Sequence, residues 1–200
     1  KSIEEQGKWI SDVIDSVGMK KASLVGHSQG CLISMECAAQ FPEKVVSLAL
    51  MGGAGEIPMN PELLDLAEKG DPKAVQLMMD WAHGPAGHFG GHPVPGLFHL
   101  NLGGTIVENG SIKDTLGVDF RACDNYKNGF ESAKKIKCPT INILGDKDKM
   151  CPLSAGKKLA DCIEGSEVEI IKNCGHMILL EEADQSLSIL KKFIKKNMMV

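Results

Sequence analysis

The sequence LVGHSQG, at residues 24–30, separates a short apolar run from a segment with helical periodicity. The run at residues 22–27 has the character of a buried strand. The segment at residues 29–40 has the character of a helix, and it ends before Pro42. The stretch therefore predicts a strand, a tight turn and a helix in immediate succession.

Two glycines flank the serine at the centre of this turn. Gly26, Ser28 and Gly30 follow the spacing G-x-S-x-G. Such a turn holds its serine in a strained backbone conformation, and side chains at the flanking positions are expected to collide with the strand and the helix. The pattern favours an exposed nucleophilic serine. The simpler alternative is a serine that only caps the following helix.

Three more strands are expected along the chain, and helical patterns lie between them. Residues 45–51 form a nearly continuous apolar run, which indicates a strand buried on both faces of a parallel sheet. Strands alternating with helices predict an α/β fold with a mostly parallel sheet flanked by helices. The other expected strands are 139–144 and 167–171, and the other expected helices are 2–17, 61–69, 72–82, 112–127, 129–136, 152–162 and 181–196.

The middle of the chain differs in character from both ends. Residues 54–128 contain helical patches around a stretch rich in Gly, Pro and His at residues 84–96, and no strong strand pattern. We interpret residues 54–128 as an inserted helical subdomain with one flexible loop. The core then consists of residues 1–53 and 129–200.

A serine hydroxyl needs a base to remove its proton, and histidine is the usual one. Of the six histidines, His27 lies inside the turn and four lie in or beside the inserted loop. His176 instead follows the last expected strand and precedes the last helix. Active sites of open parallel sheets form at the carboxyl ends of strands, so His176 is the candidate base.

A carboxylate should orient that histidine. Asp146 and Asp148 both follow the strand at residues 139–144, and the spacing alone leaves the choice between them open. The order along the chain is serine, aspartate, histidine, each just past an expected strand. That is the order of the α/β-hydrolase fold.

Three stretches resemble the α/β-hydrolase superfamily, in its capped group of esterases and carbon–carbon bond hydrolases. LVGHSQG resembles the nucleophile turn, ILGDKDKMCP at residues 143–152 the acid loop, and NCGHMILLEEADQ at residues 173–185 the histidine loop. The resemblance selects Asp148, through its spacing from Gly145 and Pro152. It implies a triad of Ser28, Asp148 and His176, and residues 54–128 as the cap.

The same resemblance implies parts that this chain does not contain. The family's sheet has about eight strands, and the strands before the nucleophile turn are missing here. The backbone N–H of Gln29 matches one donor of the oxyanion hole, and the second donor would come from the missing region. Because losing one donor typically lowers kcat by ~10²- to 10³-fold, we expect the isolated 200 residues to be weakly active and poorly soluble.

A serine nucleophile favours acyl chemistry on carboxylic esters, through an acyl-enzyme. A carbon–carbon bond hydrolase is the second candidate, and a thioesterase or acyltransferase the third. A receptor-like binding module on the same fold is the non-enzymatic alternative. Met51 and Met150 are candidate residues of the acyl pocket.

No cofactor or metal is expected. His83, His88 and His92 are separated by glycines that disfavour a helix, so a metal site there is the weaker interpretation. The net charge of -4 shows no footprint for nucleic acid or anionic membranes, and no apolar run is long enough to span a bilayer. The expected partner is a small ester or acyl compound.

The cysteines indicate a reducing compartment. There are seven, an odd number, and none form a C-x-x-C pair, so free thiols in a cytoplasmic protein fit better than a disulfide framework. The chain begins with Lys1, so a removed N-terminal signal remains compatible with the sequence.

Overall fold

The computed structural model describes residues 1–88, 104–105 and 115–198. Four strands form one sheet in the order β1-β2-β3-β4, and all three pairings are parallel. The strands occur where the sequence predicts them, with β3 shifted by one residue. They are β1 (Ala22–His27), β2 (Val45–Met51), β3 (Thr140–Gly145) and β4 (Glu167–Ile171).

The two central strands are buried on both faces, as their continuous apolarity predicts. Every residue of β3 is buried, and so are six of the seven residues of β2. The outer strands are more exposed among the described residues. Val25 in β1 is 47% exposed and Val168 in β4 is 41% exposed.

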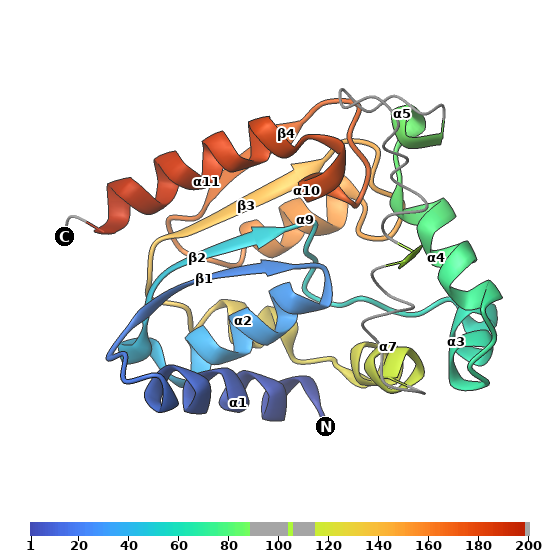
Figure 1. Ribbon diagram of the computed structural model, residues 1–200. Coiled ribbons are helices and arrows are strands. Elements are labelled where there is room, and N and C mark those ends of the chain that lie inside the picture. Colours follow the sequence, from blue (N-terminus) through green and yellow to red (C-terminus); the bar gives the residue numbers. More distant parts are fainter. Residues whose placement is uncertain (89–103, 106–114, 199–200) are drawn as a thin grey trace.

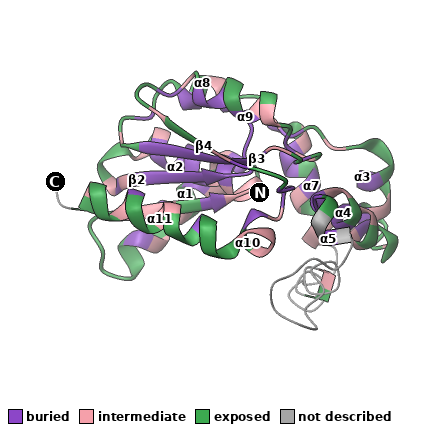
Figure 2. Ribbon diagram, turned by 90° about the horizontal axis from the view of Figure 1, so that it is seen from above, coloured by how far each residue is buried: buried purple, intermediate pink, exposed green. Residues whose placement is uncertain are grey.

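Helices cover both faces of the sheet (Figures 1 and 2). Along β2, successive side chains point to opposite faces, so Leu50 joins one core and Met51 the other. One face carries α1 (Ile3–Ser16), α2 (Gln29–Gln40), α8 (Gly129–Ala133) and α9 (Leu153–Ala160), with the short 3-10 turn Pro42–Lys44 after α2. The other face carries α10 (Ile178–Glu181) and α11 (Ala183–Met198).

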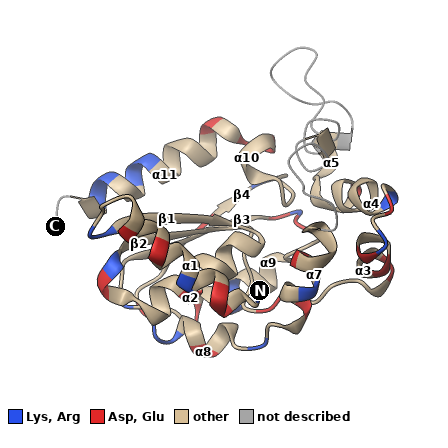
Figure 3. Cartoon of the chain, turned by 60° about the horizontal axis from the view of Figure 1, so that its bottom comes forward, with Lys and Arg blue, Asp and Glu red and all other residues tan. Residues whose placement is uncertain are grey.

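The last helix is amphipathic. Phe193 lies in the core against the sheet, whereas Lys192 and Lys196 are exposed. Figure 3 shows the basic residues of α11 in blue, gathered toward its C-terminal end. The expected helix 181–196 is divided here, because Glu182 leaves the helical conformation with φ −135° and ψ 54°. Within the described part of the chain, no helix combines the length and hydropathy needed to cross a membrane.

Four helices of the described residues lie beyond the carboxyl ends of the strands (Figure 1). They are α3 (Pro61–Glu68), α4 (Lys73–Ala82), α5 (Pro85–His88) and α7 (Thr115–Asn125). The helices α3, α4 and α7 share a small core, in which Leu63, Met79 and Phe120 are buried together.

The sequence explains where α3 begins, but it did not predict α5. Asn60 caps α3 by accepting hydrogen bonds from the backbone N–H groups of Glu62 and Leu63. The stretch 84–96 was expected to be a flexible loop, but its first residues form α5. Residues 89–96 lie outside the described residues.

A buried carboxylate joins α2 to the chain that follows α7. Glu36 is 3% exposed. It accepts hydrogen bonds from the Tyr126 hydroxyl at 2.6 Å, the Gln40 amide at 2.7 Å and the Ser132 hydroxyl. Burial and the nearby Glu36 carboxylate raise the pKa of Tyr126, so its hydroxyl stays protonated and donates. This network fixes the return of the chain from α7 to the core.

We predict that Glu36→Ala lowers the free energy of unfolding by about 3 kcal/mol, because two buried hydroxyls lose their acceptor. Glu43→Ala is the control, since Glu43 is exposed, and should change it by less than about 0.5 kcal/mol. Urea unfolding followed by circular dichroism measures both. Equal effects of the two substitutions would contradict the prediction.

Candidate active site

The turn between β1 and α2 holds Ser28 in a strained conformation, with φ 55° and ψ −123°. Gly26 is required sterically, because a Cβ at this position would lie 2.3 Å from the carbonyl oxygen of Gly30. The expectation that a side chain at Gly30 would collide is wrong, because a Cβ there would meet no neighbouring atom within 4 Å. Only the backbone of Gly30 takes part in the close approach to Gly26.

The Ser28 side chain does not cap the helix that follows it. The hydroxyl instead faces a cavity, which Gln29 and His176 also line. Gln29 is the first residue of α2, and an α-helix gives the N–H groups of its first turn no intrahelical acceptor. Its backbone N–H is thus free to serve an oxyanion.

Asp148 and His176 form a buried pair on neighbouring loops. Asp148 follows β3 and His176 follows β4, and the distance from His176 Nδ1 to Asp148 Oδ2 is 2.8 Å. Asp148 Oδ1 accepts the backbone N–H groups of Met150 and Cys151 at 2.9 and 2.8 Å. Three donors therefore hold this carboxylate, which fixes the histidine with its proton on Nδ1.

The other ring nitrogen of His176, Nε2, has a free lone pair that can accept a proton. His176 is 2% exposed, and no atom of the described residues lies within hydrogen-bonding distance of its Nε2. Ser28 and His176 line the same cavity without a direct hydrogen bond between their side chains in this structure. Such contacts often form only when a substrate is bound.

Gly52 makes room for the pair, and sequence reasoning missed it. Its φ is +56°, and a Cβ there would lie 3.1 Å from His176 Nδ1 and 3.4 Å from Asp148 Oδ2. The signal was present, since a pair of glycines follows β2 directly. The positive φ and the close approach of the pair explain why a glycine follows the strand at this point.

Asp146, the alternative acid, is not part of the pair. Its backbone N–H donates to Ile171 O at 3.0 Å, which joins its turn to the end of β4. Its Oδ1 is buried without a hydrogen bond from the described residues.

His27 supports the histidine loop from the opposite side. Its Nε2–H donates to the carbonyl oxygen of His176 at 2.8 Å, and the two ring centroids are 4.8 Å apart. Burial, and then the neighbouring His176, lower the pKa of His27 to about 4. His27 is therefore uncharged at neutral pH.

The cysteines near the site are protonated thiols. Burial raises the pKa of Cys31 to about 12, and burial followed by the Asp148 charge raises the pKa of Cys151 well above its usual value. Neither thiol is therefore activated as a nucleophile.

The cavity beside Ser28 has a volume of about 300 Å³ and a mostly apolar lining. Met150 contributes to it, as the sequence suggested. Met51 does not, and this expectation is wrong. Met51 is fully buried on the α11 side of the sheet with Ile143 and Ile171, because its position in β2 directs its side chain away from the cavity.

Two acidic residues near the site were missed. Asp119 lines the cavity from α7, and its backbone carbonyl accepts the Gln29 side-chain amide at 3.4 Å. Glu181 accepts the backbone N–H of Gly175 in the histidine loop and that of Gly84, 97 positions away. No spacing rule could find the contact of Asp119 with Gln29 or that of Glu181 with Gly84, because each joins segments far apart in the sequence.

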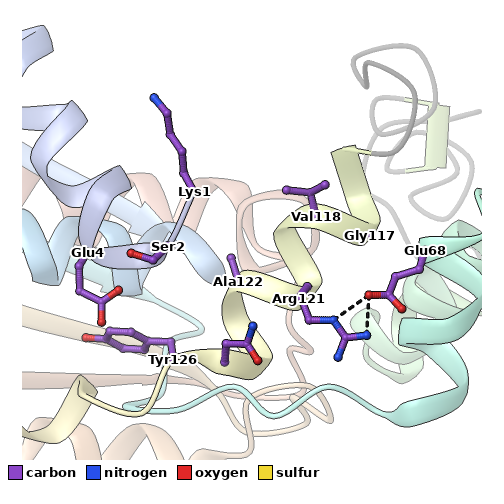
Figure 4. Close-up of a pocket in the computed structure, with 10 residues that line it drawn as sticks. Lys1, Ser2, Glu4, Glu68, Gly117, Val118, Arg121, Ala122 and Tyr126 are labelled. Carbon is purple, nitrogen blue, oxygen red and sulfur yellow. Dashed lines mark hydrogen bonds and ion pairs between the residues drawn. The ribbon is translucent and has the colours of Figure 1, made fainter.

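A second cavity of about 510 Å³ lies between the start of α1 and α7 (Figure 4). Figure 4 shows Arg121 and Glu68 joined at its rim, with 2.7 Å between Arg121 Nε and Glu68 Oε1. It is larger than the cavity beside Ser28, but none of Ser28, Asp148 and His176 lines it. The chemistry therefore belongs to the smaller cavity.

The histidines of the inserted segment do not reach Ser28 in the described structure. His83 is buried, with its Nδ1 2.9 Å from Met79 O. The side chain of His88 and the residues His92 and His99 lie outside the described residues. In the described part, no three His, Cys, Asp or Glu side chains gather as a metal site would require.

The sequence is similar to those of known hydrolases. A family model described as alpha/beta hydrolase fold matches residues 2–91. A monoacylglycerol lipase of Xenopus laevis, abhd6-A, is 29% identical over 96% of this chain. A 2-hydroxy-6-oxononadienedioate/2-hydroxy-6-oxononatrienedioate hydrolase of Escherichia coli K12 is 25% identical over 94% of it. The chain spans 61% of the length of the lipase and 67% of that of the second relative.

Solved structures agree with the topology. A thermophilic esterase superposes with a TM-score of 0.81 and 28% identity, covering 98% of this chain and 74% of the esterase. An enol-lactonase from Burkholderia xenovorans LB400, at 21% identity, has the same fold with a TM-score of 0.82, covering 98% of this chain and 74% of its own. With its parallel sheet and its strained Ser28 turn, the chain has the α/β-hydrolase fold of the proteins to which it is similar.

Proposed function

We propose that this chain carries the catalytic residues of a serine hydrolase that cleaves carboxylic esters through an acyl-enzyme. The observation that supports this most is the buried Asp148–His176 hydrogen bond, with His176 and Ser28 lining one cavity. The similarity to a lipase and an esterase supports ester chemistry.

In the proposed mechanism, Ser28 Oγ attacks the carbonyl carbon of the ester while His176 Nε2 takes its proton. The resulting oxyanion accepts a hydrogen bond from the Gln29 N–H. His176 then gives the proton to the departing alcohol oxygen as the carbon–oxygen bond breaks. Water attacks the acyl group next, with His176 again as the base, which releases the acid and restores Ser28.

Asp148 has the role of orienting the imidazole. Its Oδ1 is committed to two backbone N–H groups, so only Oδ2 is available for His176 Nδ1. A carboxylate held in this way stabilises the imidazolium that forms during each proton transfer.

Carbon–carbon bond hydrolysis is the second candidate, because the Escherichia coli relative is named for a dienedioate substrate. Such a substrate carries two carboxylates. None of the described residues that line the cavity is Lys or Arg, and one is Asp119. This lining favours the ester hydrolase.

The remaining parts of the proposal concern the cap and the compartment. We propose residues 54–128 as the cap, since the helices of this region lie over the strand ends and contribute Met78 and Phe120 to the cavity. All seven cysteines have free thiols, which supports a cytoplasmic location. The proposed substrate is a small molecule.

Replacing the nucleophile should abolish both turnover and covalent labelling. In the intact protein, Ser28→Ala is expected to lower kcat for p-nitrophenyl butyrate by about 10³-fold or more, because the acyl acceptor is lost. Fluorophosphonate labelling should disappear as well. Ser154→Ala changes an exposed serine and serves as the control. Normal labelling of the Ser28→Ala variant would contradict the assignment.

The two aspartates should differ sharply. In Asp148→Asn, the amide oxygen must remain with the two backbone N–H groups, so the NH₂ group would face His176 Nδ1 and force the proton onto Nε2. We expect kcat to fall by about 10³- to 10⁴-fold. Asp146→Asn should change kcat by less than about fivefold. Steady-state kinetics on both variants of the intact protein, with melting temperatures, checks this. Greater sensitivity at Asp146 would overturn the acid assignment.

A further inference from the structure

Five of the sixteen described residues that line the cavity beside Ser28 are methionines, with flexible thioether side chains. They come from different segments, which are the chain before α3, helix α4, the acid loop and the histidine loop. Unbranched thioethers adapt to irregular, flexible apolar groups. The methionines are Met59, Met78, Met79, Met150 and Met177.

Asp119 stands alone as a charged group in this lining. No Lys or Arg belongs to the described lining, and the ion pairs of the described residues do not include Asp119. Burial raises the pKa of its carboxyl, while a hydrogen bond with the Gln29 side chain and the charge of the N-terminal amine oppose that rise. Its backbone carbonyl bonds to the Gln29 side chain, so Asp119 lies close to the reacting serine.

From these observations, and resting on the proposed acyl transfer, we infer that the cavity accepts an uncharged, flexible alkyl acyl group and that Asp119 rejects acyl chains that end in a carboxylate. An alkyl chain replaces water against the methionines. A terminal carboxylate would meet Asp119 across a space of low polarity, with no cation in the described lining to compensate either charge.

The test compares two p-nitrophenyl esters of equal length in the intact protein, the octanoate and the monoester of octanedioic acid. We expect kcat/KM to rise about fourfold per methylene from acetate to hexanoate. The carboxylate-bearing ester should be at least about 100-fold slower than the octanoate. Asp119→Asn should narrow this gap at least about tenfold, whereas Asp80→Asn, an exposed aspartate on α4, should leave it unchanged.

Equal rates for the two esters in the wild type, or an unchanged gap in Asp119→Asn, would overturn the inference. If no ester is hydrolysed, the proposed function is wrong, and this outcome does not decide the charge preference of the cavity.

The charge preference is then measured by comparing the binding of octanamide with that of its ω-carboxylate analogue, in a calorimetric titration. Tighter binding of octanamide, reduced in preference by Asp119→Asn, supports the inference, and equal binding overturns it.

A separate observation concerns Glu181, which joins the histidine loop to helix α4. Its Oε2 accepts the backbone N–H of Gly84 at 2.8 Å and that of Gly175 at 3.1 Å. The backbones of these two glycines approach so closely that a Cβ at Gly175 would lie 2.2 Å from Gly84 N. Ala82 O accepts the backbone N–H of His176 itself at 2.7 Å.

We propose that Glu181 is a positioning residue, which fixes the position of the His176 backbone relative to the C-terminal end of α4. The same helix carries Met78 and Met79 into the cavity. A displacement of α4 by a bound acyl chain is thereby transmitted to the imidazole that removes the serine proton.

In the intact protein, Glu181→Ala should lower kcat by about 10- to 100-fold and change KM less, because the base is misplaced in the reacting state. Glu181→Gln keeps an oxygen that accepts both N–H groups and should restore kcat to within about fivefold. Glu181→Asp is too short to reach both glycines and should resemble Glu181→Ala, which keeps the test valid if the alanine variant unfolds. Exposed Glu164→Ala is the control. Unchanged kcat in folded Glu181→Asp, or no rescue by Gln, would overturn the proposal.

Discussion

The hydrogen bond between Asp148 and His176 is the interaction on which the rest of this site depends. Both side chains are almost fully buried, and they belong to loops that follow adjacent parallel strands, β3 and β4. A parallel sheet brings the carboxyl ends of its strands to one edge, and this edge is where the two loops meet. Without this partner, the buried carboxylate would keep only the backbone N–H groups of Met150 and Cys151, so the pair stabilises these loops. In the proposed mechanism it also orients the base.

Close approaches of backbone keep this pair in place. A Cβ at Gly52 would lie only 3.1 Å from His176 Nδ1 and 3.4 Å from Asp148 Oδ2. Gly145 leaves room for the carbonyl group of Gly175, since a Cβ at Gly145 would lie 2.3 Å from that oxygen. Glu181 and Ala82 add hydrogen bonds from outside the sheet. The imidazole is thus fixed by its neighbours before any substrate arrives, which reduces the reorganisation that the reaction requires.

Part of this arrangement could be predicted from local patterns. The strands of the sheet, the turn around Ser28 and the candidate His176 follow from apolar runs and from the residues just after them. Spacing left Asp146 and Asp148 open, and only the resemblance to the acid loop selected Asp148. Met51 was misassigned because alternation along a strand decides which face a side chain takes, and the pattern of a strand buried on both faces does not reveal it. Asp119 and Glu181 could not be found, since they act through tertiary contacts with residues about ninety positions away.

The tautomer of His176 tests the central claim most directly. Long-range ¹⁵N–¹H NMR on the intact protein, labelled at histidine, reports which ring nitrogen carries the proton. The account predicts that His176 is protonated at Nδ1, with a strongly deshielded proton shared with Asp148, and that its Nε2 is bare near neutral pH. A signal showing the proton of neutral His176 on Nε2 would contradict the account, because this nitrogen could then not accept the proton of Ser28.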